Sequence, residues 1–271
     1  MAVVLFSAGL DSMIHLVWAR EKFADVKAIY VNFGHRYAGI EIEAAHLICG
    51  EMHIPFFVTD VALGWAEHDD GYIPLRNLML LEIASLFGDD IVFGMLYHEG
   101  PPDKRPGFVR RMQSLLNSQY RDKKYFEHNR QIKIHTPFSG STKTQMLRWF
   151  LEKHSRHIML VRHTIGCFSA EGDCGRCMSC FNRWVAFTNC GLHGSWKYSP
   201  PRWAAEQLIA GKKERQSLFA LGAVAYKWKF ILEIYSAMRE IMSSPIRTAY
   251  RVRQTKSIDT FNDSLYCNGG F

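Results

Sequence analysis

Four cysteines in the second half of the chain are spaced like the ligands of a single metal ion. They are Cys167, Cys174, Cys177 and Cys180. Such tight spacing folds a chain around a tetrahedral ion, with Zn–S distances of about 2.3 Å. Four thiolates close the coordination sphere and leave no position for an activated water, so we expect a structural Zn²⁺. An iron–sulfur cluster, which also takes four cysteines, is the alternative.

A second group of chemical interest follows the first apolar run. It consists of Ser7, Ala8, Gly9, Leu10, Asp11 and Ser12. If a strand ends and a helix begins here, free backbone N–H groups gather at one point and can bind phosphate oxygens. An aspartate is acceptable beside phosphates only if it also binds a cation, which makes Asp11 a candidate Mg²⁺ ligand. An ordinary helix capped by Asp11 and Ser12 is the alternative.

This loop resembles the Ser-Gly-Gly-x-Asp-Ser signature of PP-loop ATP pyrophosphatases, which adenylate a substrate and release pyrophosphate. It matches neither the Walker loop nor the dinucleotide fingerprint with three spaced glycines. Ala8 stands at the first glycine of the signature. A methyl group is compatible with that position if the residue keeps a negative φ.

The elements that must position these groups follow from the alternation of apolar and amphipathic stretches. Strands are expected at residues 2–6, 27–33, 56–60 and 91–95, and helices at 12–23, 40–52, 76–87, 144–154 and around 216–242. Residues 99–107 contain three prolines and are expected to form a loop. The order predicts an α/β fold with a parallel sheet. We expect a PP-loop ATP-binding domain over 1–165, a zinc knuckle over 166–185 and a basic, Trp-rich, mostly helical extension over 186–271.

Composition limits the class of protein further. Hydrophobic residues make up 48% and charged residues 22% of the 271 residues, which is typical of a globular protein. No apolar run approaches the roughly 20 residues of a membrane span, and no signal peptide is evident, so we expect a cytoplasmic protein. The net charge is +7, and residues 195–271 hold 12 Lys/Arg against 6 Asp/Glu. This basic tail could meet nucleic acid or an acidic protein, or it could be a solvated face.

Further motifs, in a shared order over roughly residues 2–185, resemble the 7-cyano-7-deazaguanine synthase family. The segments that carry the resemblance are Asn32-Phe33-Gly34-His35-Arg36, Ile73-Pro74-Leu75-Arg76-Asn77, Pro102-Asp103-Lys104-Arg105, Thr136-Pro137 with Lys143, and the cysteine segment through Arg183. Departures lie around the expected substrate pocket: Leu75 replaces a glycine and Lys104 replaces a cysteine. The chain is therefore identified as a divergent member.

The resemblance implies an ATP-dependent carbon–nitrogen ligase of queuosine biosynthesis and a homodimer. In that family the carboxylate of 7-carboxy-7-deazaguanine is adenylated and captured by ammonia. The amide is then activated again to give the nitrile. The implied cofactors are ATP, Mg²⁺ and a structural Zn²⁺.

The resemblance also implies roles for individual residues. ATP would be held by the loop residues Ser7 to Ser12 with Asn32 and Gly34, and catalysis would use Asp11, Arg76 and Lys143. The substrate would contact His35, Arg36, Asn77, Asp103 and Arg105. Simpler alternatives are a surface arginine for Arg76, a solvated lysine for Lys143, a turn residue for His35, and an exposed ion pair for Asp103 and Arg105.

Three other functions stay open. Some relatives occur in bacterial antiviral gene clusters and phages, which suggests transfer of the activated deazaguanine to a protein amine, with the tail holding that partner. A PP-loop enzyme that modifies tRNA would use the basic tail to follow a phosphate backbone. A non-catalytic nucleotide-binding module is the third.

Overall fold

The computed structural model describes residues 1–69, 71–97, 102–122, 124, 126, 129–169, 172–210 and 228–242. At its centre is a five-stranded sheet in the order β3-β2-β1-β4-β5, and every pair of neighbouring strands is parallel. The strands are β1 (Ala2–Leu5), β2 (Val26–Asn32), β3 (Phe56–Asp60), β4 (Asp90–Val92) and β5 (Lys133–His135). The predicted parallel α/β fold is confirmed.

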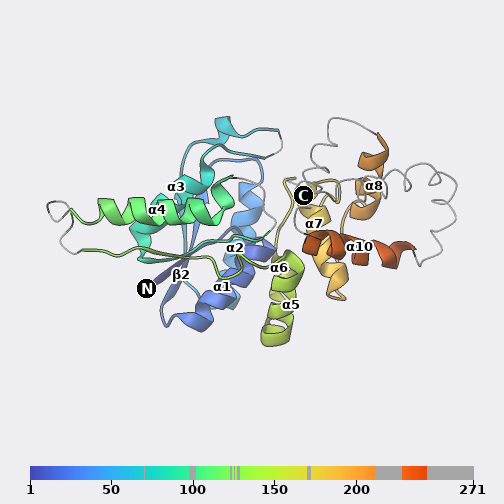
Figure 1. The fold of residues 1–271 in the computed structure, drawn as a ribbon, viewed down its shortest axis with the longest axis horizontal. Coiled ribbons are helices and arrows are strands. Elements are labelled where there is room, and N and C mark those ends of the chain that lie inside the picture. Colours follow the sequence, from blue (N-terminus) through green and yellow to red (C-terminus); the bar gives the residue numbers. More distant parts are fainter. Residues whose placement is uncertain are drawn as a thin grey trace, which may run out of the picture.

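Helices cover both faces of the sheet and continue beyond it (Figure 1). The α-helices are α1 (Leu10–Lys22), α2 (Ala38–Glu51), α3 (Arg76–Phe87), α4 (Pro106–Gln119), α5 (Lys143–His154), α6 (Leu160–His163), α7 (Met178–Asn189), α8 (Pro200–Ala210) and α10 (Trp228–Met242). Short 3-10 turns are η1 (Gly64–Ala66), η2 (Pro102–Lys104) and η3 (Ser155–His157). None of the helices in the described part of the chain has the length and apolarity that a membrane crossing needs.

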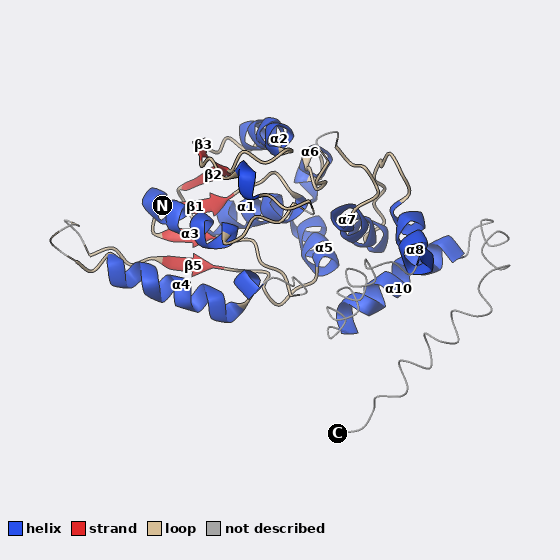
Figure 2. Ribbon diagram, turned by 90° about the horizontal axis from the view of Figure 1, so that it is seen from above, coloured by secondary structure: helices blue, strands red, loops and turns tan. Residues whose placement is uncertain are grey.

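Side chains along β1 alternate between two apolar cores, as the two-residue period of a strand requires. Val4 packs in a cluster with residues of α1, α2 and α5, whereas Val3 packs in a second cluster with residues of α3 and α4. Figure 2 shows the helices on the two sides of the sheet. Because both faces are covered, the strands are almost continuously apolar, which is why short apolar runs in the sequence identified them.

A third apolar cluster joins α7, α8 and α10. Its buried members include Trp184 of α7, Ala204 of α8 and Ala237 of α10. In Figure 1 these helices lie at the end of the molecule away from α3 and α4. The expected helix around 216–242 is helical from Trp228 to Met242, and its earlier part lies outside the described residues.

Two elements differ from the sequence prediction. The loop expected at 99–107 ends before its predicted boundary, because α4 begins at Pro106. Proline is well suited to the first helical position, because its missing N–H is not needed there and its φ is already helical. Strand β5 was not predicted, and its three residues are too few to show a period.

Two residues that stand in place of family glycines adopt left-handed backbone conformations. Ala8 has φ 52° and Leu75 has φ 59°. The condition under which a methyl group would fit without strain at position 8, a negative φ, is therefore not met. A Cβ in this region costs roughly 1–2 kcal/mol, so both positions keep the backbone of a glycine without its freedom.

Leu75 allows this cost to be measured, because its side chain is 65% exposed and contributes little burial. We expect Leu75→Gly to raise the free energy of unfolding by about 0.5–1 kcal/mol, since relief of the left-handed strain outweighs the added flexibility of the unfolded chain. Denaturant unfolding measures this. Leu86, which is exposed inside α3 and has no positive φ, is the control, and Leu86→Gly should lower the free energy of unfolding by about 1 kcal/mol.

Candidate active site

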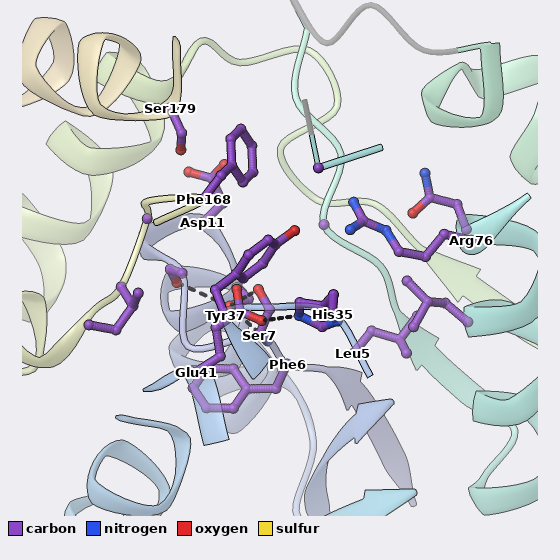
Figure 3. A pocket seen from close by; sticks show the side chains of 18 of the residues that line it. Leu5, Phe6, Ser7, Asp11, His35, Tyr37, Glu41, Arg76, Phe168 and Ser179 are labelled. Atoms are coloured by element: carbon purple, nitrogen blue, oxygen red, sulfur yellow. Dashed lines mark hydrogen bonds and ion pairs between the residues drawn. The ribbon is translucent and has the colours of Figure 1, made fainter. Parts of the chain in front are cut away.

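A cavity of about 610 Å³ opens where the carboxyl ends of the central strands meet. Its floor includes Leu5 at the end of β1, Val31 near the end of β2 and Phe93 just after β4. Its walls come from the loop before α1, from α2 and α3, and from the cysteine segment (Figure 3). Ligands bind at this edge in open parallel sheets, and the volume suits a nucleotide-sized molecule.

The loop before α1 is held in shape by its own serines. The Ser12 hydroxyl donates to the Gly9 carbonyl at 3.0 Å and accepts from the Ser7 backbone N–H at 3.3 Å. Gly9 is the N-cap residue, and no side chain caps the first turn of α1. Because residues 9–12 line the cavity, the first-turn amides and the positive end of the helix dipole lie at its wall, where an anion could bind.

An ion pair joins this loop to α5. Lys143 Nζ donates to Asp11 Oδ2 at 2.8 Å, and both side chains are largely buried at the cavity wall. Burial alone would raise the pKa of Asp11, but the charge and hydrogen bond of Lys143 outweigh it and hold the pKa below its ordinary value. Asp11 Oδ1 is buried without a hydrogen-bond partner. One oxygen of a charged carboxylate thus remains available.

A polar network occupies the side of the cavity near β2. The Tyr30 hydroxyl donates to Glu41 Oε2 at 2.7 Å, and His35 Nε2 lies 3.2 Å from the same oxygen. Burial, with the Glu41 charge, raises the pKa of Tyr30, which keeps the hydroxyl neutral and able to donate. The ring of Tyr37 packs edge-on against that of His35, with ring centroids 4.3 Å apart, and is tilted against that of Phe168, with centroids 5.7 Å apart. This side offers a carboxylate acceptor beside aromatic faces, which suits a planar base with N–H groups.

The structure brings many of the predicted residues to the cavity. Those that line it are Ser7, Gly9, Leu10, Asp11, Ser12, His35, Arg76, Asn77, Asp103 and Lys143. Ala8 is fully buried behind the loop, where its carbonyl accepts from the Ile165 amide at 2.9 Å.

Four other predicted residues do not line the cavity: Asn32, Gly34, Arg36 and Arg105. Asn32 donates to Asp60 Oδ1 at 2.8 Å and accepts from the Gly34 amide at 2.9 Å, so it shapes the turn after β2. Arg36 pairs with Glu67 at 3.1 Å. Arg105 is the N-cap residue of α4.

Sequence reasoning assigned no role to several residues of the cavity wall. They are Tyr37, Glu41, Phe168, Ser179, Asn182 and Arg183. Arg183 is buried, donates to the Thr164 carbonyl at 2.8 Å and lies 3.3 Å from the Asp173 carboxylate. Its place at the end of the cysteine motif was the available signal. The sequence holds no such signal for Glu41, because only the packing of α2 turns its side chain towards the cavity.

The four cysteines form one compact site. Their sulfur atoms all lie within 4.8 Å of one another, and a tetrahedral zinc ion would place them roughly 3.8 Å apart. Backbone N–H groups donate to the sulfurs, as from Ser169 to Cys167 at 3.3 Å and from Cys180 to Cys177 at 3.4 Å. Such donors stabilise thiolates. The donor set fits a single ion such as Zn²⁺ better than a cluster of several irons, which would hold its ligands further apart.

The fold, the loop at the strand ends and the four-cysteine site define an α/β protein of the PP-loop type. The family model described as "Queuosine biosynthesis protein QueC" matches residues 1–69 and 65–191. The chain belongs to this QueC family, as a divergent member, and is an enzyme of the ATP-dependent carbon–nitrogen ligase type.

Two individual synthases agree with this assignment. A 7-cyano-7-deazaguanine synthase of Methanosphaerula palustris is 30% identical over 221 residues, which cover 70% of this chain and 96% of that protein. The synthase of Marinomonas sp. is 28% identical over 70% of this chain and 94% of its own. Among solved structures, the U34-tRNA thiolase NcsA of Methanococcus maripaludis, with its [4Fe-4S] cluster, is 16% identical over 56% of each chain, with a TM-score of 0.34.

The cysteine site leads to a metal prediction. We expect the purified protein to carry one zinc per chain, and Cys177→Ser to lose most of it, because a hydroxyl is a poor ligand for the closed site. Elemental analysis by mass spectrometry measures the metal. Cys190, whose thiol donates to the Thr144 carbonyl, lies outside the cluster, and Cys190→Ser should keep its zinc. Equal zinc in both variants, or iron in the wild type, would contradict the assignment.

Proposed function

We propose that the protein adenylates the carboxylate of 7-carboxy-7-deazaguanine, or of a closely related deazapurine, and transfers the activated acyl group to an amine. The observation that carries the proposal is the Lys143–Asp11 ion pair at 2.8 Å, placed at the start of α1 inside the cavity. The names of the relatives point to the same substrate class.

The proposed chemistry begins with attack of the substrate carboxylate on the α-phosphorus of ATP. Pyrophosphate leaves, and an acyl adenylate forms. Ammonia then attacks the acyl carbon and AMP leaves, which gives the amide. To form a nitrile, the amide oxygen would attack the α-phosphorus of a second ATP and release pyrophosphate, and loss of AMP and a proton would complete the nitrile.

The residues of the cavity match the demands of these steps. Charge that develops on the phosphates needs fixed donors, and the α1 amides, Lys143 and Arg76 all face the cavity. The neutral Tyr30 and the Glu41 carboxylate also line the cavity and are suited to hold a base through its N–H groups.

Asp11 also fits the role of a Mg²⁺ ligand in this proposal. Its Oδ1 is buried and has no partner, and Mg²⁺ prefers carboxylate oxygens. The ion would neutralise phosphate charge as pyrophosphate leaves.

The direct test is incubation with ATP, Mg²⁺, ammonium and 7-carboxy-7-deazaguanine. We expect pyrophosphate and AMP to appear only with the base, and mass spectrometry to detect an amide or nitrile product. A base-linked adduct on a protein would make the acceptor a protein amine. Absence of base-dependent pyrophosphate release would overturn the proposal.

Lys143 provides the variant test. We expect Lys143→Met to lower pyrophosphate release by about 100-fold or more, because a fixed cation that stabilises transition-state charge is lost. Lys153, exposed in the last turn of the same helix, is the matched control, and Lys153→Met should keep wild-type rates. Steady-state pyrophosphate assays compare them, and similar rates for the two variants would remove Lys143 from the mechanism.

A further inference from the structure

Helix α10 of the C-terminal extension contacts the start of α5 beside the cavity. Its Glu233 accepts a short hydrogen bond from the hydroxyl of Thr142, the N-cap residue of α5. Thr142 directly precedes Lys143, whose side chain reaches Asp11. Glu233 is 91 positions from Thr142 in the sequence, yet it contacts the residue next to Lys143 of the cavity's ion pair.

Thr142 is fully buried and forms a capping box. Its hydroxyl oxygen accepts from the Gln145 amide at 3.1 Å, while the Gln145 side chain accepts from the Thr142 amide at 3.1 Å. For the oxygen to accept from Gln145, its hydrogen must point elsewhere, and Glu233 is the acceptor it finds. Without an acceptor the buried donor would be unsatisfied, which weakens the cap.

Both ends of Glu233 are held by different helices. Its backbone carbonyl accepts from Asn189 at the end of α7 at 2.8 Å, while its carboxylate reaches α5. Burial raises the pKa of Glu233, and the hydrogen bond from the Thr142 hydroxyl opposes that shift. A carboxyl group is expensive at this place, so its presence calls for a specific contact rather than simple packing.

We infer that Glu233 is a positioning residue: through the Thr142 hydroxyl it holds the first turn of α5, and with it Lys143, in the orientation that pairs with Asp11. The C-terminal extension is thus a part of the active site's support. The effect on turnover rests on the proposed function, whereas the effect on α5 does not.

Two substitutions of similar size separate this role from packing. Glu233→Gln keeps an oxygen that accepts from Thr142, whereas Glu233→Leu removes the acceptor and keeps an apolar stem. Tyr235, 69% exposed on the same helix, provides the control Tyr235→Leu. The first readout is hydrogen exchange of the Gln145 amide in the full-length protein without substrate.

We expect exchange of the Gln145 amide to become about tenfold faster in Glu233→Leu and to stay near the wild-type rate in Glu233→Gln and Tyr235→Leu. On a Thr142→Val background, Glu233→Leu should add no further increase. Unchanged exchange in Glu233→Leu, or equal increases in the Gln and Leu variants, would overturn the inference whether or not the protein turns over the proposed substrate.

The second readout is pyrophosphate release. If Lys143 is misplaced, kcat should fall about tenfold in Glu233→Leu, with rescue in Glu233→Gln. A wild-type protein that releases no pyrophosphate overturns the proposed function, while the exchange result still decides the inference. If the wild type is active and Glu233→Leu has the same kcat as the wild type, the inference is overturned and the proposed function is not.

Discussion

The cavity at the carboxyl edge of the sheet depends on one electrostatic contact between residues 132 positions apart, the ion pair of Asp11 and Lys143. Each partner lies in the first turn of a helix, and each helix enters at the carboxyl edge of the sheet. Two helix starts meet there because the chain crosses the sheet between parallel strands. A largely buried carboxylate without its lysine would be strongly disfavoured, so folding and the shape of the loop before α1 are tied together.

The surroundings of this pair come from three parts of the chain. The sheet and α1 supply the loop, and α5 supplies the lysine. The cysteine segment supplies a wall, in which Cys167 is both a predicted metal ligand and a cavity residue. Ile165, just before that segment, bonds to the carbonyl of Ala8 and so ties the wall to the loop. The four-cysteine site is thus an architectural part of the cavity.

Features with a local cause could be predicted from sequence. Helix α3 has the predicted bounds Arg76–Phe87, and the four cysteines come together because their spacing allows little else. Features set by distant contacts could not. Glu41 reaches the cavity only through the packing of α2, and Asn32, although it lies in a family motif, uses its side chain to close a turn.

The left-handed residues Ala8 and Leu75 flank the two helices that bring Asp11 and Arg76 to the cavity. Neither residue is a glycine, yet each adopts a backbone conformation that glycine reaches without strain. A search for glycines alone would therefore miss the two turns that start these helices, whereas their backbone angles reveal both.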